Sequence, residues 1–345
     1  MRKIALIEPG KLELQELHDK ETELQKGTVK VDVSACAICG SDLALLSGKR
    51  DMTKELYFGH EFSGVVIETA EGSSGVKLGE RVASELSRTC GQCWNCINGL
   101  PEYCRSMNDA LLPGGFTEKT LVRSMPEYSF LSAIPSTLDD VVASLLEPTN
   151  CAYHIAVKAD MKPGDNVVVF GLGAMGLLSG IILKKMGAGN VIGVGRRPAR
   201  LEQVRSAGIF DAVVTNDEGG MEQIKEVCRN AGADIVIEAT GATKVLADAI
   251  SLARYGGRVV VGSVYHGSLP DFEPLPIFRK ELTIVGAKGP TTYLKTDGSS
   301  AVVGVLNMIQ NDVKKIIKVY DYKDAMQAFE DAKSGEAIKA VITFK

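Results

Sequence analysis

The chain has 345 residues, more than one ordinary hydrophobic core accommodates, so we expect two domains. Its composition, 45% hydrophobic and 24% charged, is typical of a soluble globular protein, and no apolar run approaches the roughly 18 residues that a membrane span requires. The net charge of −4 offers no basic surface, which argues against a nucleic-acid partner. Residues 1–8 have no apolar signal core, so we expect a cytoplasmic protein.

The first 150 residues are predicted to be rich in short strands and turns. Strands are expected at 29–33, 61–68 and 79–83, separated by glycine-containing turns such as 71–75. This pattern predicts a β-rich domain.

Three short motifs in this half carry the side chains that a catalytic zinc uses. Cys39 supplies a thiolate, with the Ser41 hydroxyl two residues later, while His60 and Glu61 supply an imidazole and a carboxylate. Glu147 supplies a second carboxylate. A catalytic zinc takes about three protein ligands and leaves one position open, which this set can provide. Each motif is weak alone, because a lone cysteine is more often core and a lone histidine is more often a hydrogen-bonded structural residue.

Four closely spaced cysteines strengthen that interpretation. Their spacing is C-x2-C-x2-C-x7-C, formed by Cys90, Cys93, Cys96 and Cys104. Four thiolates suit a structural zinc held by sulfur alone. A disulfide network is the alternative, but dense cysteines in an intracellular enzyme more often bind metal.

The pattern changes at about residue 151, where apolar strands begin to alternate with helical segments such as 173–186 and 198–207. Such alternation predicts a parallel sheet with helices on both faces. The six expected strands are 166–170, 191–194, 212–215, 234–239, 258–262 and 282–286. Beyond residue 289 we expect helices at 301–310 and 322–334 and a last strand at 338–344.

A glycine-rich turn follows the first strand of this sheet and opens a helix. Gly171, Gly173 and Gly176 form the G-x-G-x-x-G pattern, in which the glycines permit a tight turn, close approach to a pyrophosphate and helix–strand packing. A purely structural turn is the alternative, but the five further βα units favour a dinucleotide. The residues assigned to cofactor binding here are Gly171, Leu172, Gly173, Ala174, Met175, Gly176, Thr240, Gly262 and Ser263.

The end of the second strand of the sheet indicates which dinucleotide binds. An acid about 20 residues beyond the motif would bind the ribose 2′-hydroxyl of NAD. This chain has Gly195, Arg196 and Arg197 there instead. A guanidinium can bind a 2′-phosphate that a carboxylate would repel, so we expect NADP(H) in preference to NAD(H). The alternative, two solvated arginines, would not explain the missing acid.

With these motifs in this order, the whole chain resembles the zinc-dependent medium-chain dehydrogenase/reductase family, and most of all its polyol (sorbitol-type) and bacterial secondary-alcohol branches. The resemblance implies a GroES-like catalytic domain, residues 1–150 and 289–345, interrupted by a six-stranded Rossmann domain, residues 151–288, with the active site in the cleft between them. It implies a structural zinc on the four clustered cysteines and a catalytic zinc on Cys39, His60 and Glu147. Glu61 resembles the neighbouring glutamate that is a ligand in some members, and Asp42 would orient His60. A homodimer or homotetramer built through the edge strands of the Rossmann sheets is also implied.

One position departs from the family. Many members have a proton-relay histidine five residues after the ligand cysteine, where this chain has Ala44. We therefore expect Ser41 to exchange the proton of the substrate with ribose hydroxyl, water or another group. The hydride would pass between the carbinol carbon and the nicotinamide, with zinc lowering the pKa of the alcohol.

The substrate is expected to be a polyol, sugar or cyclitol that reacts at a secondary hydroxyl. A simple secondary alcohol is the second choice of substrate, and a phosphorylated polyol is the third. Tyr57, Phe58 and Phe116 either line the substrate site or belong to the core. A zinc-free quinone or enone reductase of the same superfamily is disfavoured by the metal-ligand set. Two other classes, a non-catalytic NADPH-binding redox sensor and a nucleic-acid-binding zinc ribbon, would need reactive cysteines or a basic surface respectively.

Overall fold

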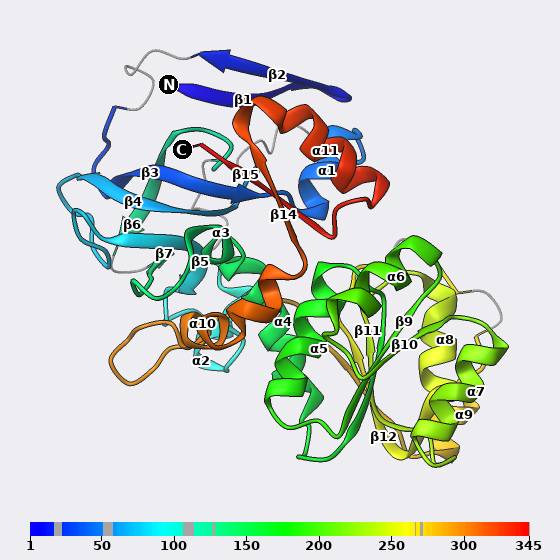
Figure 1. The fold of residues 1–345 in the computed structure, drawn as a ribbon. Helices are drawn as coiled ribbons and strands as arrows, with labels where there is room; N and C mark the ends of the chain where they lie inside the picture. The colour runs from blue at the N-terminus through cyan, green and yellow to red at the C-terminus, as the bar shows by residue number, and fades with distance from the viewer. Residues whose placement is uncertain are drawn as a thin grey trace. The chain divides into compact units, whose positions relative to one another are not determined.

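A computed structural model describes residues 1–16, 23–50, 58–105, 114–125, 128–265, 267–269 and 272–344. The chain divides into two compact units, residues 1–147 with 290–345, and residues 148–289. The first divide falls inside one helix, α4 (Leu146–Ala159). Figure 1 shows both units along the course of the chain.

The first unit is built on a seven-stranded sheet in the order β14-β15-β3-β4-β5-β7-β6. An additional β3–β6 pairing closes five of these strands into a barrel, which leaves β14 and β15 attached at one side. The strands are β3 (Thr28–Ala37), β4 (Glu61–Thr69), β5 (Arg81–Arg88), β6 (Lys119–Met125), β7 (Tyr128–Ala133), β14 (Ile317–Asp321) and β15 (Lys339–Thr343).

Alternating apolar residues fill the interior of this unit. In β3 the buried Val29, Val31 and Val33 alternate with partly exposed residues, as the period of two in a strand requires. Phe58, Phe116 and Phe329 pack with ring centroids 4.8–5.8 Å apart. A hairpin and short helices complete the unit: β1 (Arg2–Glu8), β2 (Lys11–Glu16), α1 (Gly40–Leu46), α2 (Trp94–Ile97), η3 (Pro101–Tyr103), α3 (Asp140–Ala143), α10 (Ala301–Lys314), η5 (Tyr322–Asp324) and α11 (Ala325–Ser334).

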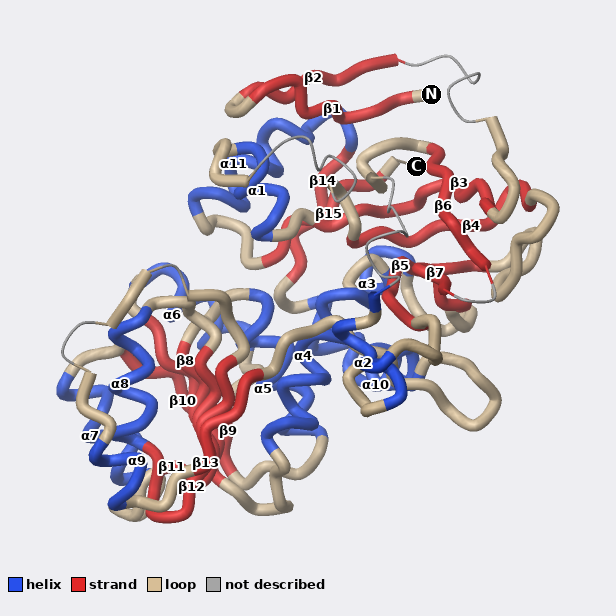
Figure 2. The backbone as a smooth tube through the Cα atoms, turned by 180° about the vertical axis from the view of Figure 1, so that it is seen from behind, coloured by secondary structure: helices blue, strands red, loops and turns tan. Residues whose placement is uncertain are grey.

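The second unit is a six-stranded parallel sheet in the order β10-β9-β8-β11-β12-β13. Helices α7, α8 and α9 lie on one side of the sheet and α5 on the other (Figures 1 and 2). Its elements are β8 (Asn166–Phe170), α5 (Ala174–Lys185), β9 (Asn190–Gly195), α6 (Pro198–Ala207), β10 (Ala212–Thr215), α7 (Glu218–Val227), β11 (Ala233–Glu238), α8 (Thr243–Leu252), β12 (Ala253–Val261), α9 (Leu275–Arg279) and β13 (Thr283–Gly286).

The strand order reverses between β8 and β11, whose carboxyl ends carry the glycine-rich turn and residues 239–242. In open parallel sheets, ligands bind in the crevice at such a reversal. The predicted fold class, a Rossmann-type sheet plus a GroES-like β domain, is therefore confirmed. Several bounds differ from the expectation: β3 runs four residues further, to Ala37, and the strand expected to begin at 258 already begins at Ala253.

Candidate functional site

Three potential metal ligands converge at the end of the β3–β4 pair. Cys39 caps the start of α1 directly after β3, and His60 and Glu61 stand at the start of β4. The antiparallel register aligns Ala37 with Glu61, which brings the two ends together. One ligand atom from each of Cys39, His60 and Glu61 lies within 4.8 Å of the others. A thiolate, an imidazole and a carboxylate at this spacing fit a zinc ion.

A buried aspartate organises this cluster. The Asp42 side chain is fully buried, and its two oxygens accept hydrogen bonds from the backbone N–H groups of Cys39 (2.8 Å) and Gly59 (3.0 Å). His60 Nδ1 lies 3.9 Å from Asp42 Oδ1. Burial by itself would lower the pKa of His60, but the charges of Cys39, Asp42 and Glu147 hold this pKa well above its ordinary value. The site therefore favours positive charge, as a cation-binding cluster does.

A buried lysine, which the sequence did not reveal, joins the cluster. Lys339 is 4% exposed, forms an ion pair with Glu61 Oε2 and donates a hydrogen bond to the carbonyl oxygen of Ile38 (3.0 Å). Although burial acts to lower it, the pKa of Lys339 is raised by the charges of Glu61 and Cys39. Only the pairing of β15 with β3 brings this lysine from the far end of the chain, so no local motif could have indicated it.

Ser41 and Glu147 occupy different positions relative to the cluster. Ser41 lies in the first turn of α1, and its buried Oγ makes no hydrogen bond within the described part of the chain. Glu147, near the start of α4, is close enough for its charge to raise the pKa of His60. It is nevertheless not a member of the group whose ligand atoms lie within 4.8 Å of one another, whereas Glu61 is.

The four clustered cysteines converge around η3 and α2. Their sulfur atoms are 3.5 Å apart between Cys93 and Cys96, 3.5 Å between Cys90 and Cys104, and 3.9 Å between Cys90 and Cys96. A tetrahedron of thiolates with Zn–S bonds of about 2.3 Å has edges of about 3.8 Å, so these distances fit a zinc ion. All four thiols are free, which removes the disulfide alternative. Backbone N–H groups of Arg105 and Cys96 lower the pKa of Cys93 to about 6.

The glycine-rich turn is shaped by close backbone contacts in the second unit. Gly171 has φ of +101°, and a Cβ there would lie 2.8 Å from the carbonyl oxygen of Ala239. A Cβ on Gly176 would lie 2.0 Å from the carbonyl oxygen of Gly171. Side chains are therefore excluded at the first and third glycines, as expected for a turn that presses a helix onto its strand.

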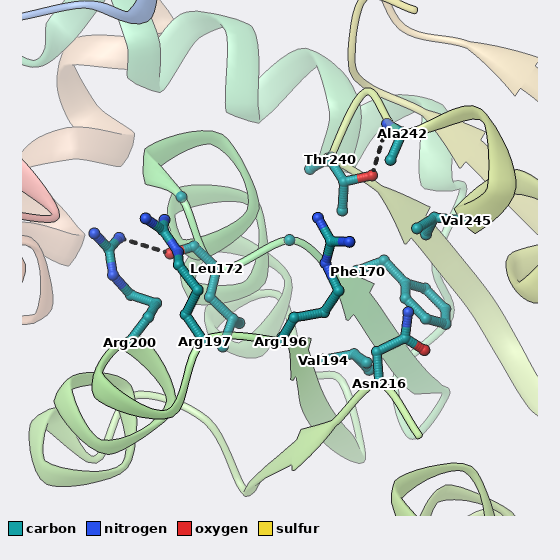
Figure 3. A pocket seen from close by; sticks show the side chains of 14 residues that line it. Phe170, Leu172, Val194, Arg196, Arg197, Arg200, Asn216, Thr240, Ala242 and Val245 are labelled. Carbon is teal, nitrogen blue, oxygen red and sulfur yellow. Dashed lines mark hydrogen bonds between the residues drawn. The ribbon is translucent and has the colours of Figure 1, made fainter. Parts of the chain in front are cut away.

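A pocket of about 650 Å³ opens beside this turn (Figure 3). Seven of the residues assigned to the cofactor line it, and Ala174, Met175 and Gly176 form the first turn of the adjoining α5. Gly262 and Ser263 do not line it. The lining is Phe170, Gly171, Leu172, Gly173, Val194, Gly195, Arg196, Arg197, Arg200, Asn216, Ala239, Thr240, Ala242 and Val245.

Three arginines contribute to this pocket, and none of the described residues lining it is acidic. Arg196 extends toward Thr240, while Arg197 and Arg200 rise beside Leu172 (Figure 3). Arg200 is 7% exposed and donates a hydrogen bond to the carbonyl oxygen of Leu172 (2.9 Å). Burial, and then the charge of Arg197, lower the pKa of Arg200 to about 10. The pocket is therefore suited to an anionic group.

Two residues of this pocket escaped the sequence analysis. In the sequence, Arg200 looks like one more surface charge of α6, but in the structure it is buried. Asn216 directly follows β10, and the rule that ligands bind at the carboxyl ends of parallel strands could have identified it. Among the aromatic residues considered for a substrate site, Phe58 and Phe116 belong to the core, and Tyr57 lies outside the described residues.

Known proteins match this chain over nearly its whole length. Residues 25–131 match the family model described as alcohol dehydrogenase GroES-like domain, and residues 174–302 match the one described as zinc-binding dehydrogenase. The chain is 33% identical over 325 residues to a probable D-xylulose reductase A of Arthroderma otae, covering 91% of this chain and 89% of that protein. The chain belongs to the zinc-dependent medium-chain dehydrogenase family. A sorbitol dehydrogenase of Halalkalibacterium halodurans is 30% identical over 323 residues, 92% of each chain.

Solved structures of this dehydrogenase family share the fold throughout. The 2R,3R-butanediol dehydrogenase from Bacillus subtilis is 25% identical and superposes with a TM-score of 0.81 over 100% of this chain and 99% of that one. Galactitol-1-phosphate dehydrogenase from Escherichia coli, at 20% identity, superposes with a TM-score of 0.83 over both complete chains, which is a likeness of fold. Among the described residues, no helix has the length and apolar character needed to cross a membrane.

Proposed function

We propose that this medium-chain dehydrogenase transfers a hydride between NADP(H) and a secondary alcohol or ketone of a polyol, sugar or cyclitol. The observation that carries the proposal is the convergence of Cys39, His60 and Glu61 in a chain whose relatives include a sorbitol dehydrogenase and xylulose reductases. A redox sensor that uses only the cysteine loop would not require this second group of ligands.

Two zinc ions per chain are part of the proposal. Cys39 and His60, with Glu61 or Glu147, would hold the catalytic ion, and the four clustered cysteines would hold the structural one. A catalytic zinc would supply a Lewis acid that polarises a carbonyl and makes an alcohol more acidic. The tight ligand cluster and the tetrahedral sulfur spacing support both sites.

Ser41 is the residue proposed to exchange the proton of the substrate. Its Oγ is buried, makes no hydrogen bond within the described residues and follows Cys39 by two positions. A hydroxyl can accept a proton from one partner while it donates its own to another. Because Ala44 cannot continue the relay, the next partner would be a ribose hydroxyl or water.

The preference for NADP(H) rests on the charge of the dinucleotide pocket. The cofactor supplies the nicotinamide carbon that accepts or releases the hydride. Arg196 and Arg197 can make charge-assisted hydrogen bonds to a 2′-phosphate, and no acid among the described lining residues is available to bind the 2′-hydroxyl of NAD.

We also propose a homodimer or homotetramer built through β13. This strand ends the parallel sheet, and its Thr283, Ile284 and Gly286 are exposed. An exposed edge strand offers unpaired backbone groups to a second copy.

A cytoplasmic location completes the proposal, because thiols stay reduced there and the cysteine loop carries four free thiols.

The test is a reductase and dehydrogenase assay of the zinc-loaded protein with NADP⁺, NAD⁺ and their reduced forms. The panel contains polyols, ketoses, cyclitols, their phosphates, small vicinal diols and simple secondary alcohols. Turnover with a polyol or sugar and a higher kcat/KM with NADP⁺ supports the proposal. Turnover confined to simple alcohols, or a preference for NAD⁺, contradicts the substrate or the cofactor part. Metal analysis that finds fewer than two zinc ions per chain contradicts the metal part.

A further inference from the structure

A buried carboxylate stands beside the dinucleotide pocket without belonging to its lining. Glu238 is the last residue of β11, the strand next to β8, and its side chain is fully buried. Within the described residues no lysine or arginine forms an ion pair with it, so its charge is stabilised by hydrogen-bond donors. Burying a negative charge next to a site for phosphate groups costs free energy, so the presence of Glu238 at this position calls for a structural explanation.

The donors of Glu238 come from the two loops that follow β11 and β12. One carboxylate oxygen accepts from the backbone N–H of Thr240 (2.7 Å) and from the Thr240 hydroxyl. The other oxygen accepts from the Ser263 hydroxyl. A carboxylate can only accept, so both hydroxyl protons must point at it.

This arrangement orients the remaining lone pairs of the two hydroxyls. Thr240 Oγ1 accepts from the backbone N–H of Ala242 (3.0 Å; dashed in Figure 3), and Ser263 Oγ accepts from the backbone N–H of Gly241 (3.0 Å). The carboxylate thus fixes three successive backbone N–H groups: that of Thr240 directly, and those of Gly241 and Ala242 through the two hydroxyls.

The fixed turn forms one wall of the pocket. Ala239, Thr240 and Ala242 line the pocket directly. The turn also presses against the first glycine of the phosphate-binding turn, because a Cβ on Gly171 would lie 3.0 Å from Cγ2 of Thr240. A small displacement of Thr240 therefore reaches both the pocket wall and the glycine-rich turn.

We propose that Glu238 is a positioning residue for the dinucleotide, holding the turn of residues 239–242 through the hydroxyls of Thr240 and Ser263. Its effect on the reaction is indirect, through the shape of the pocket. The inference rests on the proposed function only in that the pocket takes a nicotinamide dinucleotide.

The first test is Glu238→Gln, which keeps the size of the side chain but replaces one acceptor by a donor. The amide nitrogen can no longer accept, so either the Ser263 hydroxyl has to reverse or the backbone N–H and hydroxyl of Thr240 lose their acceptor. Titration of the full-length, zinc-loaded protein with NADP⁺ and NADPH, followed by nicotinamide fluorescence or calorimetry, should show dissociation constants at least about tenfold higher, the effect of misdirecting one hydrogen bond to a charged group. The kcat at saturating cofactor should stay within about threefold, because the chemistry lies elsewhere.

Glu85→Gln is the matched control. Glu85 is 1% exposed and accepts from two serine hydroxyls, Ser132 (2.7 Å) and Ser300 (2.9 Å), but it belongs to the other unit. The Glu85→Gln variant should have a lower melting temperature than the wild type, and its dinucleotide dissociation constants should stay within about twofold of the wild-type values. An equal weakening of dinucleotide binding in the control would overturn the inference, because general destabilisation would then explain both variants.

A second variant protects the test against misfolding of Glu238→Gln. Ser263 does not line the pocket, so weaker dinucleotide binding by Ser263→Ala would support an effect through the turn. We expect its dissociation constant to rise several-fold. If both variants bind NADPH as the wild type does, the inference is wrong while the proposed function stands. If the wild type binds neither dinucleotide, both are wrong.

Discussion

Replacing Lys339 by methionine should destabilise the first unit strongly. Lys339 and Glu61 are 4% and 1% exposed, and the substitution leaves the Glu61 carboxylate buried without its cation. Removal of one partner from a buried ion pair costs about 3–5 kcal/mol of unfolding free energy. For a unit of about 200 residues this corresponds to a melting temperature lower by about 6–20 °C. The measurement is urea and thermal unfolding of wild type and Lys339→Met.

Two further variants give the prediction its specificity. Lys339→Arg keeps the charge and should lose far less stability than Lys339→Met. The double variant Glu61→Gln with Lys339→Met removes both charges, so it should be more stable than Lys339→Met alone, since a buried pair replaced as a whole is close to neutral. An unfolding free energy of Lys339→Met within about 1 kcal/mol of wild type, or a double variant no more stable than Lys339→Met, would refute the reasoning.

The remaining predictions concern the cofactor, the structural metal, acid stability and assembly. The double variant Arg196→Ser with Arg197→Ser should lower kcat/KM for NADP⁺ by roughly 100-fold, because two charge-assisted hydrogen bonds are lost. Its kcat/KM for NAD⁺ should change by less than about threefold. Equal losses of kcat/KM with the two cofactors would contradict the role of these arginines in binding the 2′-phosphate. Cys104→Ser should remove one zinc per chain in metal analysis and lower the melting temperature, and an unchanged zinc content would argue against the cysteine site. Hydrogen bonds from a lysine, a tyrosine and a glutamine lower the pKa of Asp331 to about 2 from 3.8, so its stabilising effect is present above about pH 4 and is lost as the pH falls toward 2. The gap in melting temperature between wild type and Asp331→Asn should therefore narrow between pH 5 and pH 2, and a constant gap would contradict this. Ile284→Lys on the exposed edge strand β13 should shift the mass seen in light scattering toward the monomer, and an unchanged mass would exclude this edge as the interface.

The features that the sequence predicts well are those whose cause is local. The glycine-rich turn is recognisable because the contacts that exclude a Cβ at Gly171 and Gly176 arise within one strand–turn–helix unit. The alternation of strands and helices also has a local cause, because each βα unit buries its own apolar face. This alternation therefore identifies the parallel sheet. The ligand atoms of the cysteine loop also come from one stretch of 15 residues, Cys90 to Cys104.

The features that the sequence does not reveal depend on pairing between distant strands. Lys339 reaches Glu61 only because β15 adds to the barrel beside β3. Likewise, the sequence offers both Glu61 and Glu147 as carboxylate ligands, and the register of β3 against β4 decides that Glu61 joins Cys39 and His60. A buried lysine and an exposed one have the same local sequence signature, and burial is set by the assembled sheet.

The charges of the metal-ligand cluster explain why a lysine is buried there at all. With Cys39, Asp42 and Glu61 ionised and His60 neutral, as in a metal site, three negative charges surround the single positive charge of Lys339, and the charge of Glu147 also reaches His60. A divalent cation and Lys339 therefore both offset the negative charge of this cluster. Removing the lysine makes the cluster more negative by one charge, and a bound dication offsets the negative charge only in part. The loss of stability in Lys339→Met should therefore be larger after chelation of zinc than with zinc bound, and equal losses in the two states would show that the ion and the lysine do not share the charge of this cluster.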